Sequence, residues 1–170
     1  MSILVVGDGP RDQLALPEIV RNLLGLKVVT RYDDLHKVIY LKEKGSANVR
    51  KVKYLTRRAR SNGFLVLAIV VDRDKCRRRE RLGDLHEGRD EVRRSSPPFP
   101  TALGEADPHF DVWLLDDVVA VREGLGLSGD VEVPNAVSVV SPKEILAKLI
   151  RECPRNHTEA SDFLGEFLDA

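Results

Sequence analysis

An apolar run of eight residues, Phe64 to Val71, constrains the fold of this chain more than any other feature. It is bounded by Asn62-Gly63 on one side and by Asp72 on the other. An uninterrupted apolar run of this length between turn residues is typical of a β-strand that is covered on both faces. Such strands occur in parallel sheets that have helices packed against both faces.

Further strands and helices alternate along the chain. The pattern predicts strands over Ile3–Val6, Lys27–Arg31 and Thr101–Glu105, and helices over Leu16–Leu24, Leu35–Lys42, Val49–Arg60 and from about Phe110 onward. Gly25 is expected to cap the first helix, whereas Pro17 predicts a late start or a kink in it. Strands that alternate with helices predict an α/β fold with a central, mostly parallel β-sheet flanked by α-helices.

The length of 170 residues and the hydrophobic content of 42% predict a single domain over residues 1–170. We expect a charged excursion at about 75–100 and a C-terminal helical segment at about 142–169, with Ser141 as its N-cap and Pro142 in its first turn. The formal net charge of zero gives no overall attraction to nucleic acid or membrane, so any basic surface must be local.

Two features bear on the cellular compartment. Cys76 and Cys153 match no thiol-redox or zinc spacing, and the chain has neither a basic leader nor an apolar run that could span a bilayer. We therefore expect a cytoplasmic protein with no membrane partner.

Acidic residues follow two of the expected strands. Asp72 and Asp74 are two positions apart, so in extended backbone their side chains point the same way. Asp8 follows the first strand and lies between Gly7 and Gly9. In a parallel sheet these strand ends share one edge, where carboxylates could hold Mg²⁺. A solvated turn is the alternative for each.

A third acidic segment runs from Pro108 to Asp117. Its Trp113 is expected to pack in a core, and Asp111 could complement a helix dipole. Three histidines show no ligand spacing: His36, His86 and His157. His109, near Asp111, could act as an acid or a ligand, but a lone histidine in a polar loop is more often only hydrogen-bonded.

Taken in order, Val5–Asp12, Val70–Asp74 and Phe110–Asp117 resemble segments of the TOPRIM-like domain family, in particular small proteins related to the TOPRIM domain of OLD-type nucleases. The segment that begins at Ser141 also looks like the C-terminal helix start of that family, so the resemblance covers nearly the whole chain. It implies an α/β fold in which a glutamate after the first strand and an Asp-x-Asp pair hold magnesium for cutting or joining phosphodiesters.

By position, the resemblance implies that Mg²⁺ or Mn²⁺ is held by Asp8, Asp72, Asp74 and Asp111, with Asp8 and Asp72 as catalytic residues. Asp8 and Asp111 stand where the family has glutamate. Aspartate is one methylene shorter, so its carboxylate would fall short by roughly an ångström, which catalysis tolerates poorly.

Arginines near these acids are candidates for binding phosphate. They are Arg11, Arg73, Arg77 and Arg78, and the basic run continues to Arg79 and Arg81. Another basic set recurs at helical spacing and could face nucleic-acid phosphates or be a solvated helix face: Arg50, Lys53, Arg57 and Arg60.

These features predict a TOPRIM-type nuclease that hydrolyses phosphodiesters with a divalent metal. The main alternative is a non-catalytic TOPRIM-like binding or regulatory protein, for example a toxin–antitoxin or defence-system component, and a phosphatase or nucleotide hydrolase is a third. Nucleic acid is the expected partner, and a partner ATPase, a toxin or antitoxin protein, or a second copy of the chain are further candidates. DNA and RNA are both candidate substrates, and the site could hold one metal or two.

Overall fold

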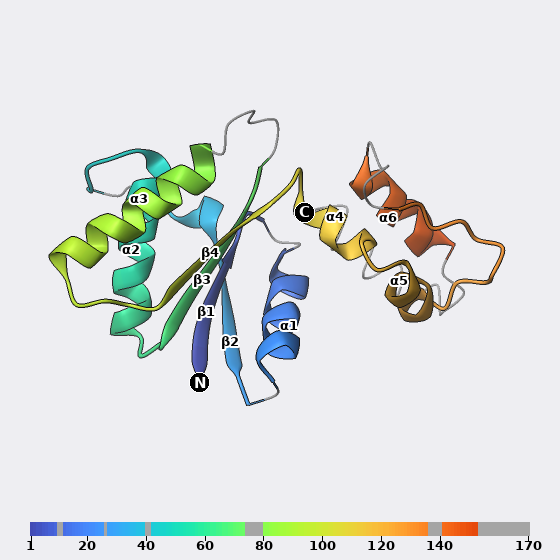
Figure 1. The fold of residues 1–170 in the computed structure, drawn as a ribbon, viewed down its shortest axis with the longest axis horizontal. Coiled ribbons are helices and arrows are strands. Elements are labelled where there is room, and N and C mark those ends of the chain that lie inside the picture. The colour runs from blue at the N-terminus through green and yellow to red at the C-terminus, as the bar shows by residue number, and fades with distance from the viewer. Residues whose placement is uncertain (10–11, 26, 40–41, 74–79, 136–140, 153–170) are drawn as a thin grey trace. The chain divides into compact units, whose positions relative to one another are not determined.

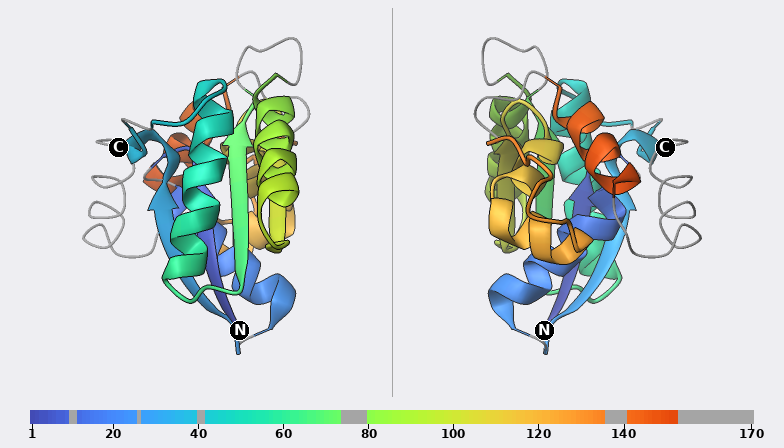
Figure 2. Two further views of the ribbon diagram at one scale, coloured as in Figure 1. Left: turned by 90° about the vertical axis from the view of Figure 1, so that its left-hand side faces the viewer. Right: turned by 90° about the vertical axis from the view of Figure 1, so that its right-hand side faces the viewer.

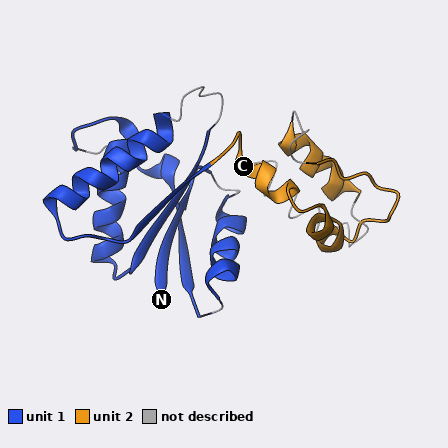
Figure 3. Ribbon diagram, in the orientation of Figure 1, with its two compact units in different colours: residues 1–105 blue, residues 106–170 orange. Residues whose placement is uncertain are grey.

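The computed structural model describes residues 1–9, 12–25, 27–39, 42–73, 80–135 and 141–152. The chain divides into two compact units, Met1–Glu105 and Ala106–Ala170 (Figure 3). The single domain expected over residues 1–170 stays a prediction, because compact units are defined by packing and not by independent folding. Among the described helices, none has the length and apolar character needed to cross a bilayer.

The first unit is an α/β fold built on a four-stranded, all-parallel sheet with the strand order β2-β1-β3-β4 (Figure 1). Its strands are β1 (Ser2–Gly7), β2 (Val29–Asp34), β3 (Val66–Asp72) and β4 (Thr101–Ala106). β1 pairs on one side with β2, in the register Ile3 to Thr30, and on the other with β3, in the register Ile3 to Val66. The predicted fold class is confirmed.

Helices cover both faces of this sheet. α2 (Ala47–Ser61) and α3 (Glu80–Ser95) lie on one face and α1 (Asp12–Leu24) lies on the other (Figures 1 and 2). A short 3-10 helix, η1 (Leu35–Lys37), follows β2, where a helix over Leu35–Lys42 was expected. α1 begins at Asp12 and continues through Pro17, so the expected late start is wrong.

The main core lies between β3 and the α2–α3 layer. Leu67, Ile69 and Val71 are fully buried, whereas the residues between them are only half-buried. Helices cover both faces of the sheet as expected, but one face of β3 is fully buried and the other is only half-buried.

The expected charged excursion contains helix α3. Only Leu85 and Gly88 of this helix are buried. A Cβ atom at Gly88 would lie 2.8 Å from the carbonyl oxygen of Val49 and 3.0 Å from the Cβ of Val52, so the two helix backbones approach closely at this glycine. Close packing on α2, rather than an apolar stripe, accounts for the helix.

The second unit contains α4 (Phe110–Leu115), α5 (Val118–Leu125) and α6 (Pro142–Arg151). Its core includes Leu115, Val133, Leu146 and Leu149. α6 begins as predicted, with Ser141 as N-cap and Pro142 in the first turn. Trp113 of α4 packs edge-on against Phe110 but is 40% exposed, so the expectation that it packs in a core is wrong. The predicted helical residues beyond 152 lie outside the described part of the chain.

Candidate functional site

Asp8 lies directly after β1, at the carboxyl edge of the sheet. Its side chain is 9% exposed. Oδ2 of Asp8 accepts a hydrogen bond from the backbone N–H of Asp72, the last residue of β3, over 3.2 Å. The expectation that the ends of these two strands come together is therefore correct.

The loop after β1 is fixed by Asp12, the first residue of α1. The backbone N–H of Asp8 donates to Oδ2 of Asp12 over 2.7 Å. At Gly7 a Cβ atom would lie 2.5 Å from both Cβ and Oδ2 of Asp12, so any larger residue would force Asp12 to shift. Asp12 thus anchors the turn that carries Asp8.

Tyr32 supports the same loop from β2. Its hydroxyl donates a hydrogen bond to the carbonyl oxygen of Gly9. Burial, followed by the nearby carboxylates of Asp12 and Asp34, raises the pKa of the Tyr32 phenol well above its ordinary value. Tyr32 is therefore a neutral donor over the whole physiological range.

Asp34 places a further carboxylate at this edge, at the end of β2. It is buried, and its Oδ1 accepts a hydrogen bond from the backbone N–H of His36 over 2.8 Å, which caps η1. The strand expected over Lys27–Arg31 instead runs from Val29 to Asp34. Extending the strand to its true end would have shown Asp33 and Asp34 as strand-end acids.

Three basic side chains surround Asp8. Nη2 of Arg81 lies 2.6 Å from both carboxylate oxygens of Asp8, and Nη1 of Arg81 donates to the carbonyl oxygen of Asp72 over 2.9 Å. Nε2 of His36 lies 3.3 Å from Oδ1 of Asp8, but this imidazole is 66% exposed. Lys51 is half-buried, and this burial is the main cause that lowers its pKa. The charge of Arg81 lowers the pKa further, whereas the carboxylates of Asp8 and Asp34 raise it.

From the sequence, His36 and Lys51 had no expected role in the site, and Arg81 was expected only as part of the basic run that could bind phosphate. A signal for Arg81 was present, because it continues the basic run that begins soon after Asp72. Its pairing with Asp8 depends on the position of α3, which the sequence pattern did not predict.

The other predicted site residues are placed as follows. Arg73 is half-buried directly after β3, and Asp111 lies in the first turn of α4 in the second unit. Four residues lie outside the described part of the chain: Arg11, Asp74, Arg77 and Arg78. Their predicted roles stay predictions.

The donor set suits a hard cation. Carboxylate and carbonyl oxygens of Asp8 and Asp72 are ligands that Mg²⁺ and Mn²⁺ accept, and Mg²⁺ commonly needs only one or two carboxylates with waters in the remaining positions. Within the described residues, no three histidine, cysteine, aspartate or glutamate side chains are grouped to hold a metal ion. A site at this edge would therefore depend on few carboxylates and on retained water.

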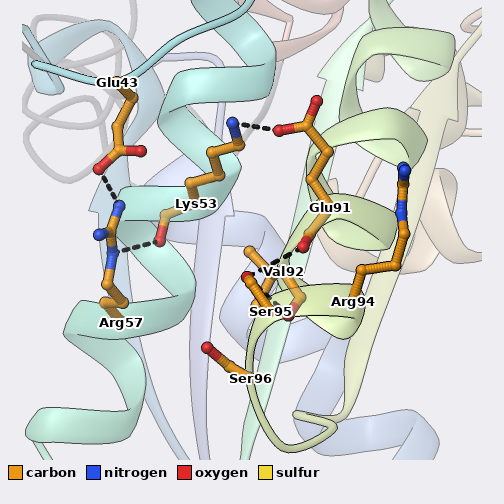
Figure 4. A pocket seen from close by; sticks show the side chains of 8 residues that line it. All are labelled: Glu43, Lys53, Arg57, Glu91, Val92, Arg94, Ser95 and Ser96. Atoms are coloured by element: carbon orange, nitrogen blue, oxygen red, sulfur yellow. Dashed lines mark hydrogen bonds and ion pairs between the residues drawn. The ribbon is translucent and has the colours of Figure 1, made fainter.

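A separate cavity of about 330 Å³ lies against α2 and α3 (Figure 4). Two of the basic residues that recur at helical spacing line this cavity, and both are paired: Lys53 with Glu91 and Arg57 with Glu43. Arg60 donates to the carbonyl oxygen of Pro97 over 2.6 Å and stacks 5.5 Å from the centre of the Phe99 ring. Lys53, Arg57 and Arg60 therefore all bind partners within the first unit.

Comparison of the chain with protein-family models, with curated proteins and with solved structures found no match.

Proposed function

We propose that this protein is a TOPRIM-type nuclease that hydrolyses phosphodiester bonds of nucleic acid with Mg²⁺ or Mn²⁺. The observation that carries the proposal is the contact between the ends of β1 and β3, where Oδ2 of Asp8 accepts from the backbone N–H of Asp72 over 3.2 Å. This contact joins two of the acids that the TOPRIM resemblance assigns to the metal.

Asp8 and Asp72 would hold the metal, together with Asp74 as the resemblance implies. A bound divalent ion polarises a phosphate and lowers the pKa of a bound water. Asp8 would complete the coordination or act as the general base, and the buried Asp12 and the neutral Tyr32 hold its loop in position. Arg73, beside Asp72, is the described arginine that we assign to the substrate phosphate.

The alternative is a non-catalytic nucleic-acid-binding or regulatory protein of TOPRIM-like fold. It is favoured by the contacts of Arg81 with both carboxylate oxygens of Asp8 at 2.6 Å. An acid that is already neutralised by a guanidinium, and that is shorter than the family's glutamate, is a poor general base. Such a protein would bind nucleic acid, or a toxin, antitoxin or ATPase partner, without cleaving a substrate.

Manganese titration of the full chain, followed by electron paramagnetic resonance, tests the site. We expect Asp8→Asn and Asp72→Asn each to weaken Mn²⁺ binding by at least about tenfold, since even the loss of an outer-shell partner of a metal ligand costs this much. Asp90→Asn is the matched control, because Asp90 is an exposed acid of α3 that pairs with Arg89. Absence of Mn²⁺ binding by the wild-type chain, or equal binding by all variants, would contradict the metal site.

Cleavage is tested on single-stranded DNA, duplex DNA and RNA. The nuclease proposal expects metal-dependent products that the Asp72→Asn and Asp74→Asn variants do not form. Metal binding and nucleic-acid binding without cleavage would support the alternative instead. Equal trace activity in the wild type and in Asp74→Asn would identify a contaminating nuclease.

A further inference from the structure

Arg81 bridges the two strand ends that form the proposed metal site. It lies in the first turn of α3, with its side chain 19% exposed. One guanidinium nitrogen lies 2.6 Å from both carboxylate oxygens of Asp8, and another donates to the carbonyl oxygen of Asp72 over 2.9 Å. A single cationic group thus contacts oxygens from both β1 and β3.

These oxygens are the kind that bind a hard divalent cation. A metal bound by both oxygens of the Asp8 carboxylate would take a position close to that of Nη2 of Arg81. Two cations cannot share this position, because their charges repel strongly where both are partly shielded from water. Metal binding at Asp8 therefore requires the guanidinium to move away.

We propose that Arg81 acts as an internal counter-cation, a side chain that neutralises Asp8 until a divalent metal displaces it. This inference rests on the proposed metal site and adds its regulation. Its consequence is that the affinity for metal is reduced by the free energy needed to break the Arg81 contacts.

The other basic groups near Asp8 do not fit this role equally well. His36 lies farther from Asp8, at 3.3 Å, and is 66% exposed, so water screens its interaction. Lys51 has a lowered pKa that arises chiefly from its burial, and it has no ion pair with Asp8 as close as that of Arg81. Arg81 alone of these three combines short contacts to both carboxylate oxygens with a bond to β3.

The test measures Mn²⁺ affinity of the full chain without substrate, in the wild type and in Arg81→Gln. We expect Arg81→Gln to bind Mn²⁺ at least about tenfold more tightly, because hydrogen bonds between charged groups are worth at least that ratio. Arg81→Lys should stay nearer to the wild type, since it keeps the charge. Arg89→Gln is the matched control: Arg89 lies on the same helix, is 21% exposed and pairs with Asp90 rather than Asp8.

The outcomes separate this inference from the proposed function. Equal or weaker Mn²⁺ binding by Arg81→Gln, with binding retained in the wild type, overturns the role of Arg81 and leaves the metal site standing. No Mn²⁺ binding by any variant overturns both. Tighter binding by Arg89→Gln to the same degree overturns the role of Arg81 as well, because the effect would then reflect net charge.

A measurement on the wild-type chain guards against a folding defect in Arg81→Gln. The guanidinium group of an arginine rotates slowly when it is held in an ion pair. Nuclear magnetic resonance of ¹⁵N-labelled arginine side chains detects this slow rotation. The signal of Arg81 is identified by its absence from the spectrum of Arg81→Lys. We expect the rotation of the Arg81 guanidinium to become faster when Mg²⁺ saturates the protein. Rotation that stays equally slow at saturation with Mg²⁺ would overturn the proposal.

Discussion

The backbone N–H of Asp72 donates a hydrogen bond to Oδ2 of Asp8 over 3.2 Å, across 64 positions of the sequence. The bond is made where β1 and β3 end side by side. It positions the Asp8 carboxylate through the backbone of a neighbouring strand. The geometry of Asp8 therefore depends on the sheet as much as on its own loop.

Gly7→Ala should destabilise the protein by about 1–3 kcal/mol, the usual cost of overpacking. The added Cβ would lie 2.5 Å from atoms of Asp12 and would push apart the turn that carries Asp8. Urea denaturation measures the free energy of unfolding. Gly9→Ala is the matched control, because a Cβ there has no atom within 4 Å, and its unfolding free energy should change by less than about 0.5 kcal/mol. Equal effects of both substitutions would contradict the role assigned to the Gly7–Asp12 contact.

Tyr32→Phe should cost about 0.5–1.5 kcal/mol at neutral pH, because the hydrogen bond to the Gly9 carbonyl is lost. The pKa of Tyr32 is raised in the folded protein above its ordinary value of 10.0. Above this pH the unfolded chain releases the phenolic proton while the folded protein keeps it, so the unfolding free energy of the wild type falls as pH rises. Tyr32→Phe should reduce this alkaline decline. Tyr54→Phe, which changes an exposed tyrosine of α2, should leave the decline unchanged, and a decline that is the same in all three proteins would argue against a buried Tyr32 phenol.

Lys51 should react with amine-directed acylating reagents at a lower pH than Lys37, whose side chain is 78% exposed. The reason is that burial lowers the pKa of Lys51, and Asp8 opposes this shift. Removing the opposing charge in Asp8→Asn should lower the midpoint of the rate-against-pH profile further, as followed by mass spectrometry. A midpoint that rises in Asp8→Asn would show that the two groups do not interact as the structure places them.

Gly88→Ala should destabilise the protein by about 1–3 kcal/mol, because its Cβ would meet the Val49 carbonyl oxygen at 2.8 Å. Gly83, on the same helix, has no atom within 4 Å of an added Cβ. Gly83→Ala should therefore be neutral or stabilise by up to about 1 kcal/mol. Thermal unfolding of the two variants compares them directly, and a loss of stability in Gly83→Ala as large as in Gly88→Ala would contradict close helix packing at Gly88.

The sequence predicted the meeting of Asp8 and Asp72 because two short-range patterns and one topological rule were enough. Each acid follows an apolar strand, and parallel strands end at a common edge. The same logic failed for Asp34. β2 is an edge strand whose residues are largely exposed or half-buried, so its last residues lack the apolar pattern from which a strand is recognised.

Helix α3 shows a second limit. Its sequence is almost entirely charged, and its place in the fold depends on Gly88 approaching the backbone of Val49. Such a contact between distant segments leaves no periodic pattern in the sequence. Because Arg81 is carried by this helix, its pairing with Asp8 could not be predicted either.

β1 is hydrogen-bonded on both sides, from Ser2 to Gly7 against β2 and from Ile3 to Val6 against β3. An insertion or deletion of one residue within β1 would have to break both ladders or reverse which side chains face the core. Surface loops can grow or shrink at a much smaller cost. As such a chain diverges in evolution, length changes should therefore accumulate in its loops, while the spacing from Ile3 to Asp8 stays constant.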